Sequence, residues 1–231
     1  MREKTITKTN LIDELKKSSQ RISELEKEVA KGKENEILLR EIHHRVRNNM
    51  QIISSLLRLQ SKKIKDKKLL EILKVSQSRI RSMALIHEKF YRSTDLARIE
   101  LDKYIQDLAL YLCHMYGIAP NIIKLNTDME NIHIEINKAV CLGLITNELI
   151  SNSLRHAFPN NHKGEIRIGL RKIIDSKYEL VITDNGVGFP EDIDFPNSSS
   201  LGIQLVNELV KQIEGNIDFN GKRGAVFRIT F

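Results

Sequence analysis

The 231-residue sequence predicts an α+β protein, in which an N-terminal coiled coil and a helical hairpin precede an α/β sandwich with a mixed sheet. Two observations predict this class. In the first 95 residues, apolar side chains recur at alternating spacings of three and four, the pattern of helices that pair along a seam. In the remainder, strand-type and helix-type segments alternate, which is typical of helices covering one face of a mixed sheet.

The N-terminal seam begins at Leu11, continues to Val29 and keeps its phase across Gly32 into the next segment. Glycine costs about 1 kcal/mol relative to alanine in a helix interior, so Gly32 marks either a hinge or a tolerated imperfection. We therefore expect a coiled-coil helix over residues 1–37.

A helical hairpin is expected over residues 38–95. The charged segment SKKIKDKK at 61–68 separates two amphipathic helices. Their apolar stripes are together too wide to remain exposed in a single chain. Two copies should therefore pair as a dimeric four-helix bundle, which makes the protein a homodimer.

Residues 96–231 are expected to form the sandwich domain. Apolar periodicity and the turn residues between segments divide it into helices and strands. The expected helices cover about 101–116, 137–157 and 201–214, and the expected strands cover 122–125, 165–173, 178–183, 216–219 and 225–231.

Composition excludes several classes of protein. No stretch of about 18 uncharged apolar residues exists, so no membrane span is expected, and the N-terminus lacks the apolar core of a signal peptide. Cys113 and Cys141 lie in apolar helical runs and are expected to be reduced thiols. We expect the chain in the cytoplasm, by itself or as the cytoplasmic part of a larger or membrane-associated receptor.

Charge is unevenly distributed. Residues 1–95 contain 23 Lys and Arg against 13 Asp and Glu, a net charge of +10, whereas residues 96–231 contain 14 against 17, a net charge of −3. The basic residues alternate with acidic ones and have no stacking aromatics beside them, so no nucleic-acid site is expected. An acidic protein partner fits this asymmetry better.

Two adjacent histidines lie in the first hairpin helix. At ~100° per residue, the apolar stripe from Leu39 to Leu57 has His43 on its flank and His44 nearly opposite. His44 is therefore expected to face solvent and to be the better candidate for modification by a second domain.

Three segments of the second half form a candidate nucleotide site. NELISNSLRH at 147–156 is an expected helix with Glu148, Asn152 and His156 on one face. DNGVGF at 184–189 follows a strand, and its two glycines would let the backbone approach a ligand. SLGIQLV at 200–206 opens a helix whose N-terminus suits a phosphate.

These segments, in this order, resemble the Bergerat-type ATP-binding domain of sensor histidine kinases, type II topoisomerases, Hsp90-type chaperones and mismatch-repair ATPases. The resemblance runs from about Ala119 to Phe231. Residues 38–60, LLREIHHRVRNNMQIISSLLRLQ, resemble the phosphoacceptor helix of a histidine-kinase subfamily marked by His-Arg-x-Lys/Arg-Asn-Asn. Residues 79–93 resemble the partner helix of that subfamily.

The resemblance implies an ATP-dependent histidine kinase that phosphorylates His44 and passes the phosphoryl group to an aspartate of a response-regulator receiver domain. In such a site Asp184 accepts the adenine amino group, and Asn152 is a ligand of Mg²⁺. The remaining nucleotide-binding positions are Arg155, His156, Gly186, Gly188, Ser200, Leu201 and Gly202.

Some roles stay open. Glu148 stands where many histidine kinases have asparagine and hydrolytic relatives have a water-activating glutamate, so either Glu148 or Glu41 is a candidate base. Asn48, one turn after His44, is a candidate to orient water for dephosphorylation of the partner. An ATPase or serine kinase of the same fold and a non-catalytic dimeric scaffold remain alternatives, the latter because Ser200 and Ala225 depart from the family pattern.

The resemblance also implies a source of input. No sensory domain fits in the segment that precedes the acceptor helix, so an upstream sensor domain or partner protein is expected to supply the signal.

Overall fold

The computed structural model describes residues 37–92, 98–119, 121–174, 177–189, 195 and 200–231. The expected coiled coil before residue 37 and most of the loop at 190–199 lie outside these residues. The part of the chain from His44 onward forms one compact unit. In the described ranges, no helix combines the length and the apolar character needed to cross a bilayer.

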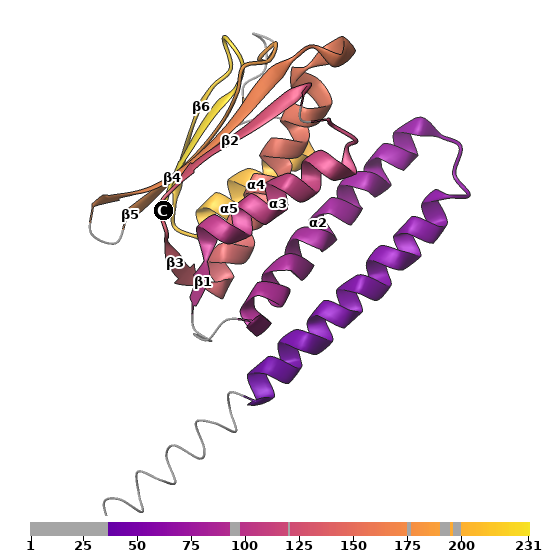
Figure 1. Cartoon of the computed structure of the whole chain (residues 1–231), viewed down its shortest axis with the longest axis vertical. Helices are drawn as coiled ribbons and strands as arrows, with labels where there is room; N and C mark the ends of the chain where they lie inside the picture. Colours follow the sequence, from indigo (N-terminus) through magenta and orange to yellow (C-terminus); the bar gives the residue numbers. More distant parts are fainter. Residues whose placement is uncertain (1–36, 93–97, 120, 175–176, 190–194, 196–199) are drawn as a thin grey trace, which may run out of the picture. The chain divides into compact units, whose positions relative to one another are not determined.

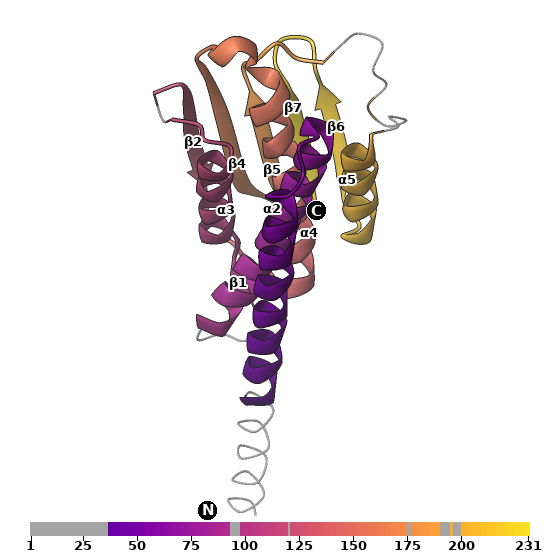
Figure 2. The same cartoon turned by 90° about the vertical axis from the view of Figure 1, so that its right-hand side faces the viewer.

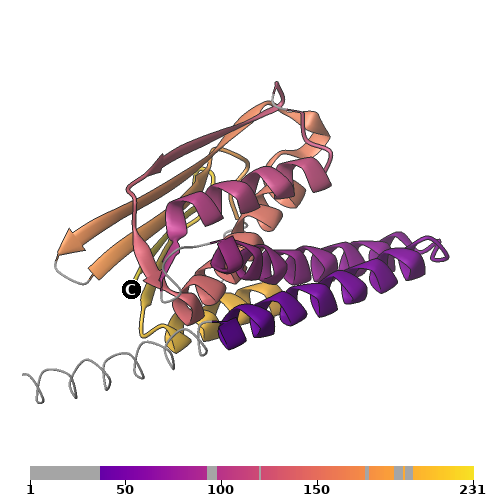
Figure 3. The same ribbon diagram turned by 60° about the horizontal axis from the view of Figure 1, so that its bottom comes forward.

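The helical hairpin consists of a helix over residues 37–61 and α2 (Lys67–Arg92). Asp66 begins α2, because its Oδ1 accepts hydrogen bonds from the backbone N–H groups of Lys68 at 2.8 Å and Leu69 at 3.3 Å. Figure 3 shows residues 44–61 and α2 lying side by side. The charged segment thus separates two helices as predicted.

The second half contains a five-stranded sheet in the order β2-β4-β5-β7-β6. Only β2 and β4 are parallel, and the other neighbours are antiparallel, so the predicted mixed sheet is confirmed. The strands are β2 (Ile123–Met129), β4 (Gly164–Ile174), β5 (Lys177–Asp184), β6 (Asn216–Asn220) and β7 (Val226–Thr230).

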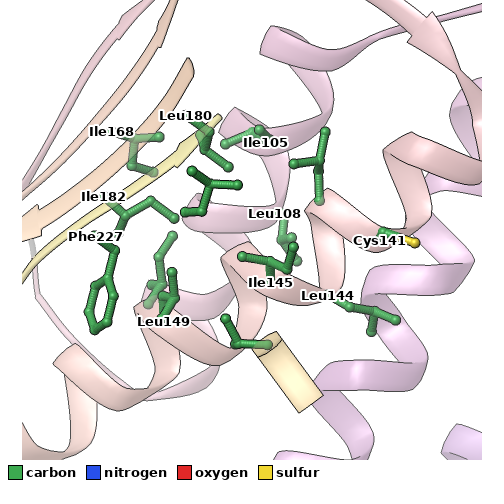
Figure 4. Close-up of a cluster of buried hydrophobic side chains, with 14 of the residues drawn as sticks. Ile105, Leu108, Cys141, Leu144, Ile145, Leu149, Ile168, Leu180, Ile182 and Phe227 are labelled. Carbon is green, nitrogen blue, oxygen red and sulfur yellow. The ribbon is translucent and has the colours of Figure 1, made fainter. Parts of the chain in front are cut away.

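Three helices cover one face of this sheet, as Figures 1 and 2 show. They are α3 (Leu101–Met115), α4 (Ile136–Asn152) and α5 (Leu201–Gln212). The core lies between the two layers, where Ile105, Leu108, Ile145 and Leu149 of the helices face Ile168, Leu180, Ile182 and Phe227 of the strands (Figure 4). This arrangement leaves the ends of α4 and β5 at the same edge of the domain.

The structure corrects several expected boundaries. The helix expected to end at residue 157 is α-helical only to Asn152, and Ser153–Ala157 form a turn of π-helix. The strand expected at 122–125 extends to Met129, because as an edge strand β2 accommodates the polar residues that ended the prediction. A small sheet of β1 (Arg98–Glu100) and β3 (His133–Glu135) was not predicted, since three-residue strands leave too short a pattern.

Candidate functional site

A cavity of about 460 Å³ lies where the ends of α4 and β5 meet the start of α5 and β7. Six of the residues predicted for nucleotide binding line it together. Among the described residues its wall consists of Asn152, Ser153, Arg155, His156, Ala157, Asp184, Val187, Gly188, Phe189, Ser200, Ile203, Ala225 and Phe227.

Asp184 ends β5, lines this cavity and is 7% exposed. Its Oδ2 accepts a hydrogen bond from Ser153 Oγ at 2.6 Å, and its Oδ1 accepts from the backbone N–H groups of Gly186 at 3.0 Å and Ala225 at 3.2 Å. A buried carboxylate with this many donors is held in one orientation. The Ala225 contact is a backbone one, so the alanine at this position leaves it intact.

The glycines after Asp184 pack closely against other parts of the protein backbone. A Cβ on Gly186 would lie 2.3 Å from the Ala157 carbonyl oxygen, and a Cβ on Gly188, at φ +76°, would lie 2.3 Å from the Gly221 carbonyl oxygen. Both glycines therefore permit close contact between protein backbones. Gly188 lines the cavity, while Gly186 shapes it by packing against the π-helical turn.

The π-helical turn aims Arg155 back along α4. Its Nη2 donates to Asn152 Oδ1 at 2.5 Å, and its Nε donates to the Ser151 carbonyl oxygen at 3.2 Å. Arg155 Nη1 also lies 3.7 Å from the Glu71 carboxylate of α2. Asn152 Oδ1, the oxygen predicted to bind Mg²⁺, thus accepts a hydrogen bond from the cationic Arg155 side chain. This contact could not be predicted from the sequence, which indicated a regular helix here.

His156 lines the cavity beside Arg155. Desolvation by burial, followed by the positive charge of Arg155, lowers the pKa of His156 below its ordinary value, and Glu71 opposes this shift. His156 therefore presents a neutral imidazole to the cavity at neutral pH.

A second cavity, of about 340 Å³, adjoins the first and shares Asn152, Arg155 and Ser200 with it. Leu201, Gly202 and Glu148 belong to this second cavity, and α2 forms its opposite wall. The predicted site residues of the sandwich domain therefore line, or lie beside, two adjoining cavities.

Glu148 is 1% exposed and is engaged by a side chain from the hairpin. Arg79 of α2 donates from Nε to Oε1 at 2.7 Å and from Nη2 to Oε2 at 2.8 Å. Asn147 Nδ2 donates to the same Oε1 at 3.2 Å. This bidentate pair raises the pKa of Arg79 above its ordinary value, against the effect of burial. The sequence contained no signal that paired Arg79 with Glu148.

The histidine region lies on the helix over residues 37–61. His43 and His44 are both half-buried, so His44, which was expected to face solvent, is only partly exposed in this structure. Asn48, one turn later, places Nδ2 3.4 Å from His44 Nδ1 and so covers part of the ring. Burial lowers the pKa of His43. Glu41 is exposed on the same helix.

His44 lines neither of the two cavities. The predicted site residues therefore fall into two groups, one on the hairpin helix and one on the sandwich domain. Contact between the groups requires a movement or a second copy of the chain.

An aromatic cluster beside the cavity was missed by the sequence analysis. Phe195 stacks on Phe219 with ring centroids 4.6 Å apart, and Phe219 stacks on Phe227 at 4.9 Å. Phe189 meets Phe219 edge to face at 4.9 Å. Phe195 is 3% exposed, so its ring is buried within this cluster.

Two protein families match this chain, one over each of the two groups of site residues. Residues 41–116 match the family described as histidine kinase, and residues 137–231 match the family described as histidine kinase-, DNA gyrase B- and HSP90-like ATPase. Sensor histidine kinase PdtaS of Mycobacterium tuberculosis is 31% identical over 188 residues, which cover 80% of this chain and 37% of that protein.

A second relative and a solved structure are also described as histidine kinases. Blue-light-activated histidine kinase 2 of Erythrobacter litoralis is 26% identical over 197 residues, covering 83% of this chain and 56% of that protein. The solved histidine kinase domain of the blue-light-activated kinase EL346 from Erythrobacter litoralis superimposes with a TM-score of 0.64 at 25% identity, covering 84% of this chain and 89% of that one.

The chain thus spans between about a third and a little over half of the length of these two relatives. Both family matches and the superposition agree with the order of the elements, from the helical hairpin to the sandwich with a mixed sheet. The chain belongs to the sensor histidine kinase family and contains a Bergerat-type ATP-binding domain.

Proposed function

We propose that this chain is the core of an ATP-dependent protein histidine kinase, which phosphorylates its own His44 and passes the phosphoryl group to an aspartate of a response-regulator receiver domain. The observation that carries the proposal is the pair of adjoining cavities that share Asn152, Arg155 and Ser200. The first contains a fixed, buried carboxylate suited to adenine, and the second contains Lys68, Arg79 and Arg155, whose charges suit phosphates, beside Glu71 and Glu148.

In this proposal the adenine amino group donates to Asp184 in the first cavity. The phosphates extend past Asn152 and Arg155 towards the second cavity, where the N-terminus of α5 offers backbone N–H groups. Asn152 Oδ1 is a hard oxygen ligand suited to Mg²⁺, which when bound would neutralise phosphate charge.

The transfer step forms a bond between His44 Nε2 and the γ-phosphorus and breaks the bond from that phosphorus to the β–γ bridging oxygen, so ADP leaves. Neutral imidazole is the nucleophile. The tautomer with its proton on Nδ1 leaves the Nε2 lone pair available for the attack. Glu148 and Glu41 both remain candidates for the base that removes the proton from the phosphorylated ring.

The hairpin is proposed to pair with a second copy of the chain. Large apolar side chains of its described part remain exposed, which is unusual for helices that stay single. They include Ile52 at 59%, Ile53 at 47%, Leu56 at 55%, Leu59 at 56% and Ile72 at 55% exposed. A four-helix bundle would bury them, and a receiver domain and an upstream sensor would then act on this dimer.

Residues 1–37, 38–95 and 96–231 are proposed as the coiled-coil signalling helix, the dimerisation and phosphotransfer hairpin, and the catalytic domain. The basic hairpin region also suits an acidic receiver domain as partner.

The proposal is tested by incubation with γ-labelled Mg-ATP, comparing the unaltered chain with His44→Gln and with the adjacent control His43→Gln. A label that is lost in acid, stable in alkali and abolished only by His44→Gln is expected. A label abolished only by His43→Gln would move the acceptor to the neighbouring residue.

A second candidate, an ATPase of the same fold, is favoured by the position of Glu148 in the second cavity. It predicts release of free phosphate with no labelled histidine. Equal phosphate release by the unaltered chain and by His44→Gln would support it, and loss of release in Glu148→Gln would assign the water-activating base.

A further inference from the structure

Arg79 of α2 and Glu148 of α4 form the most buried charged contact between the hairpin and the sandwich domain that the described residues show. The Glu148 side chain is 2% exposed and that of Arg79 is 21% exposed. Their two hydrogen bonds, at 2.7 and 2.8 Å, have the parallel geometry of a guanidinium bound to a carboxylate. A phosphate offers the same pair of oxygens to such a group.

The Glu148 carboxylate also lies against the start of α5. A Cβ on Gly202 would be 2.8 Å from Oε2, so this glycine leaves room for the carboxylate and its arginine. Arg79 therefore points to the place where the N–H groups of α5 are available to an anion. That place lies in the second cavity, beyond Asn152 and Arg155 as seen from Asp184.

The charges lining the second cavity come from both sides. Lys68, Glu71 and Arg79 belong to α2, while Glu148 and Arg155 belong to α4 and its π-helical turn. Arg155 is in turn 3.7 Å from Glu71. Both arginines thus connect the two sides through carboxylates, and a polyanion entering the cavity would compete with those carboxylates for the same guanidinium groups.

We propose that Arg79 binds the terminal phosphate of the nucleotide, and that it exchanges Glu148 for this phosphate when ATP, rather than ADP, is bound. The inference rests on the proposed kinase function. A terminal phosphate brings negative charge next to the buried Glu148 carboxylate and offers Arg79 an equivalent bidentate partner. The exchange loosens the contact between α2 and α4, so the hairpin senses whether a transferable phosphate is present.

A diphosphate lacks the terminal group and reaches no further than Asn152 and Arg155. With ADP, Arg79 therefore keeps Glu148 as its partner and α2 stays attached to α4. The Arg79–Glu148 pair therefore distinguishes ATP from ADP at the contact between the helical hairpin and the sandwich domain.

The test compares the affinities of ADP and of a non-hydrolysable ATP analogue by titration calorimetry in the full chain. Arg79→Gln is expected to weaken the analogue by about tenfold, the loss typical of one charge-assisted hydrogen bond, and to leave ADP affinity unchanged. Glu148→Gln is expected to strengthen the analogue, because Arg79 then has no charged competitor. Arg81→Gln is the matched control, since that guanidinium lies over the Tyr111 ring, 5.7 Å from its centroid.

Hydrogen exchange of α2 gives a second readout that does not depend on affinity. The analogue should increase exchange in the unaltered chain relative to ADP, and this difference should vanish in Arg79→Gln. Equal weakening of both nucleotides, or no change in either, would overturn the role of Arg79 while leaving the labelling of His44 unaffected. Failure of the unaltered chain to bind either nucleotide would overturn the kinase proposal as well.

Discussion

Ser153 Oγ donates a hydrogen bond of 2.6 Å to Asp184 Oδ2, and both residues are buried. Ser153 occupies the first position of the π-helical turn after α4, so this bond ties the helix that contains Asn152 to the strand that ends in Asp184. The two halves of the nucleotide cavity are therefore held in register by one side chain.

Ser153→Ala is predicted to weaken ATP binding. The substitution removes the donor that orients Oδ2, and a hydrogen bond to a charged group contributes about 1.5–3 kcal/mol, so the Kd should rise by tenfold or more. Binding of a fluorescent ATP analogue measures the change. Ser78→Ala is a suitable control, because that buried hydroxyl donates to the Val75 carbonyl oxygen of its own helix and does not line the cavity. An unchanged Kd for Ser153→Ala would show that the backbone donors alone orient Asp184.

Asn48→Ala is predicted to abolish dephosphorylation of the receiver partner. Self-phosphorylation should stay within about threefold of the unaltered chain, because the contact of 3.4 Å between Asn48 Nδ2 and His44 Nδ1 is too long to contribute much to the orientation of the ring. Phosphate release from a phosphorylated receiver domain and labelling of His44 measure the two activities separately. Asn49→Ala, on the exposed adjacent position, is the control and should change neither. A large loss of labelling in Asn48→Ala would instead assign Asn48 to positioning of the acceptor ring.

Gly143→Ala is predicted to destabilise the domain, although alanine is ordinarily the better helix former. A Cβ at this position of α4 would lie 1.8 Å from the buried Tyr104 hydroxyl, which is held by Ser82. Such overpacking costs about 1–3 kcal/mol. Thermal unfolding measures the effect. Gly169→Ala in β4 is the control, because its Cβ would meet neighbours at 3.8 Å and should be tolerated.

Features whose signal lies within a single helix or strand were predicted correctly from the sequence. The alternation of apolar residues located the five strands of the main sheet, and the segments around Asn152, Asp184 and Ser200 indeed line one cavity. These signals are local, since periodicity and turn residues act over a few positions.

What was missed depends on contacts between distant elements. The Arg79–Glu148 pair joins positions 69 residues apart, and the Phe195–Phe219–Phe227 stack assembles residues from three segments. The π-helical turn after Asn152 ends at Ala157, whose carbonyl oxygen accepts a hydrogen bond from Val187 N–H, a residue 30 positions later that a sequence pattern does not pair with it. Composition and spacing carry no information on such pairings.

Ile52→Glu is predicted to convert the proposed dimer into a monomer. Ile52 is 59% exposed on the hairpin, and a charge there would have to be buried in a four-helix bundle without a partner. Light scattering after size-exclusion chromatography measures the mass. Ile174→Glu is the matched control, because that isoleucine is 67% exposed at the end of β4, outside the hairpin. Dissociation by both substitutions, or by neither, would contradict a dimer formed through the hairpin.

The stability of the domain is predicted to fall as the pH drops below ~6.5, the ordinary value for histidine, partly through His156. Burial and the charge of Arg155 lower the pKa of His156 in the folded chain, with Glu71 opposing, so the unfolded chain binds a proton at a higher pH than the folded one. As the pH falls from that ordinary value towards the lower pKa of the folded chain, proton binding therefore favours the unfolded chain. Above the ordinary value, His156 does not contribute to the pH dependence of stability. His43, whose pKa is lowered by burial, acts in the same direction.

Urea unfolding at a series of pH values measures the free energy of unfolding. In this acid range it should fall less steeply with decreasing pH in both His156→Gln and His156→Asn than in the unaltered chain. An unchanged slope in both variants would mean that His156 titrates alike in the folded and unfolded states, and that the cavity accepts a charged imidazole.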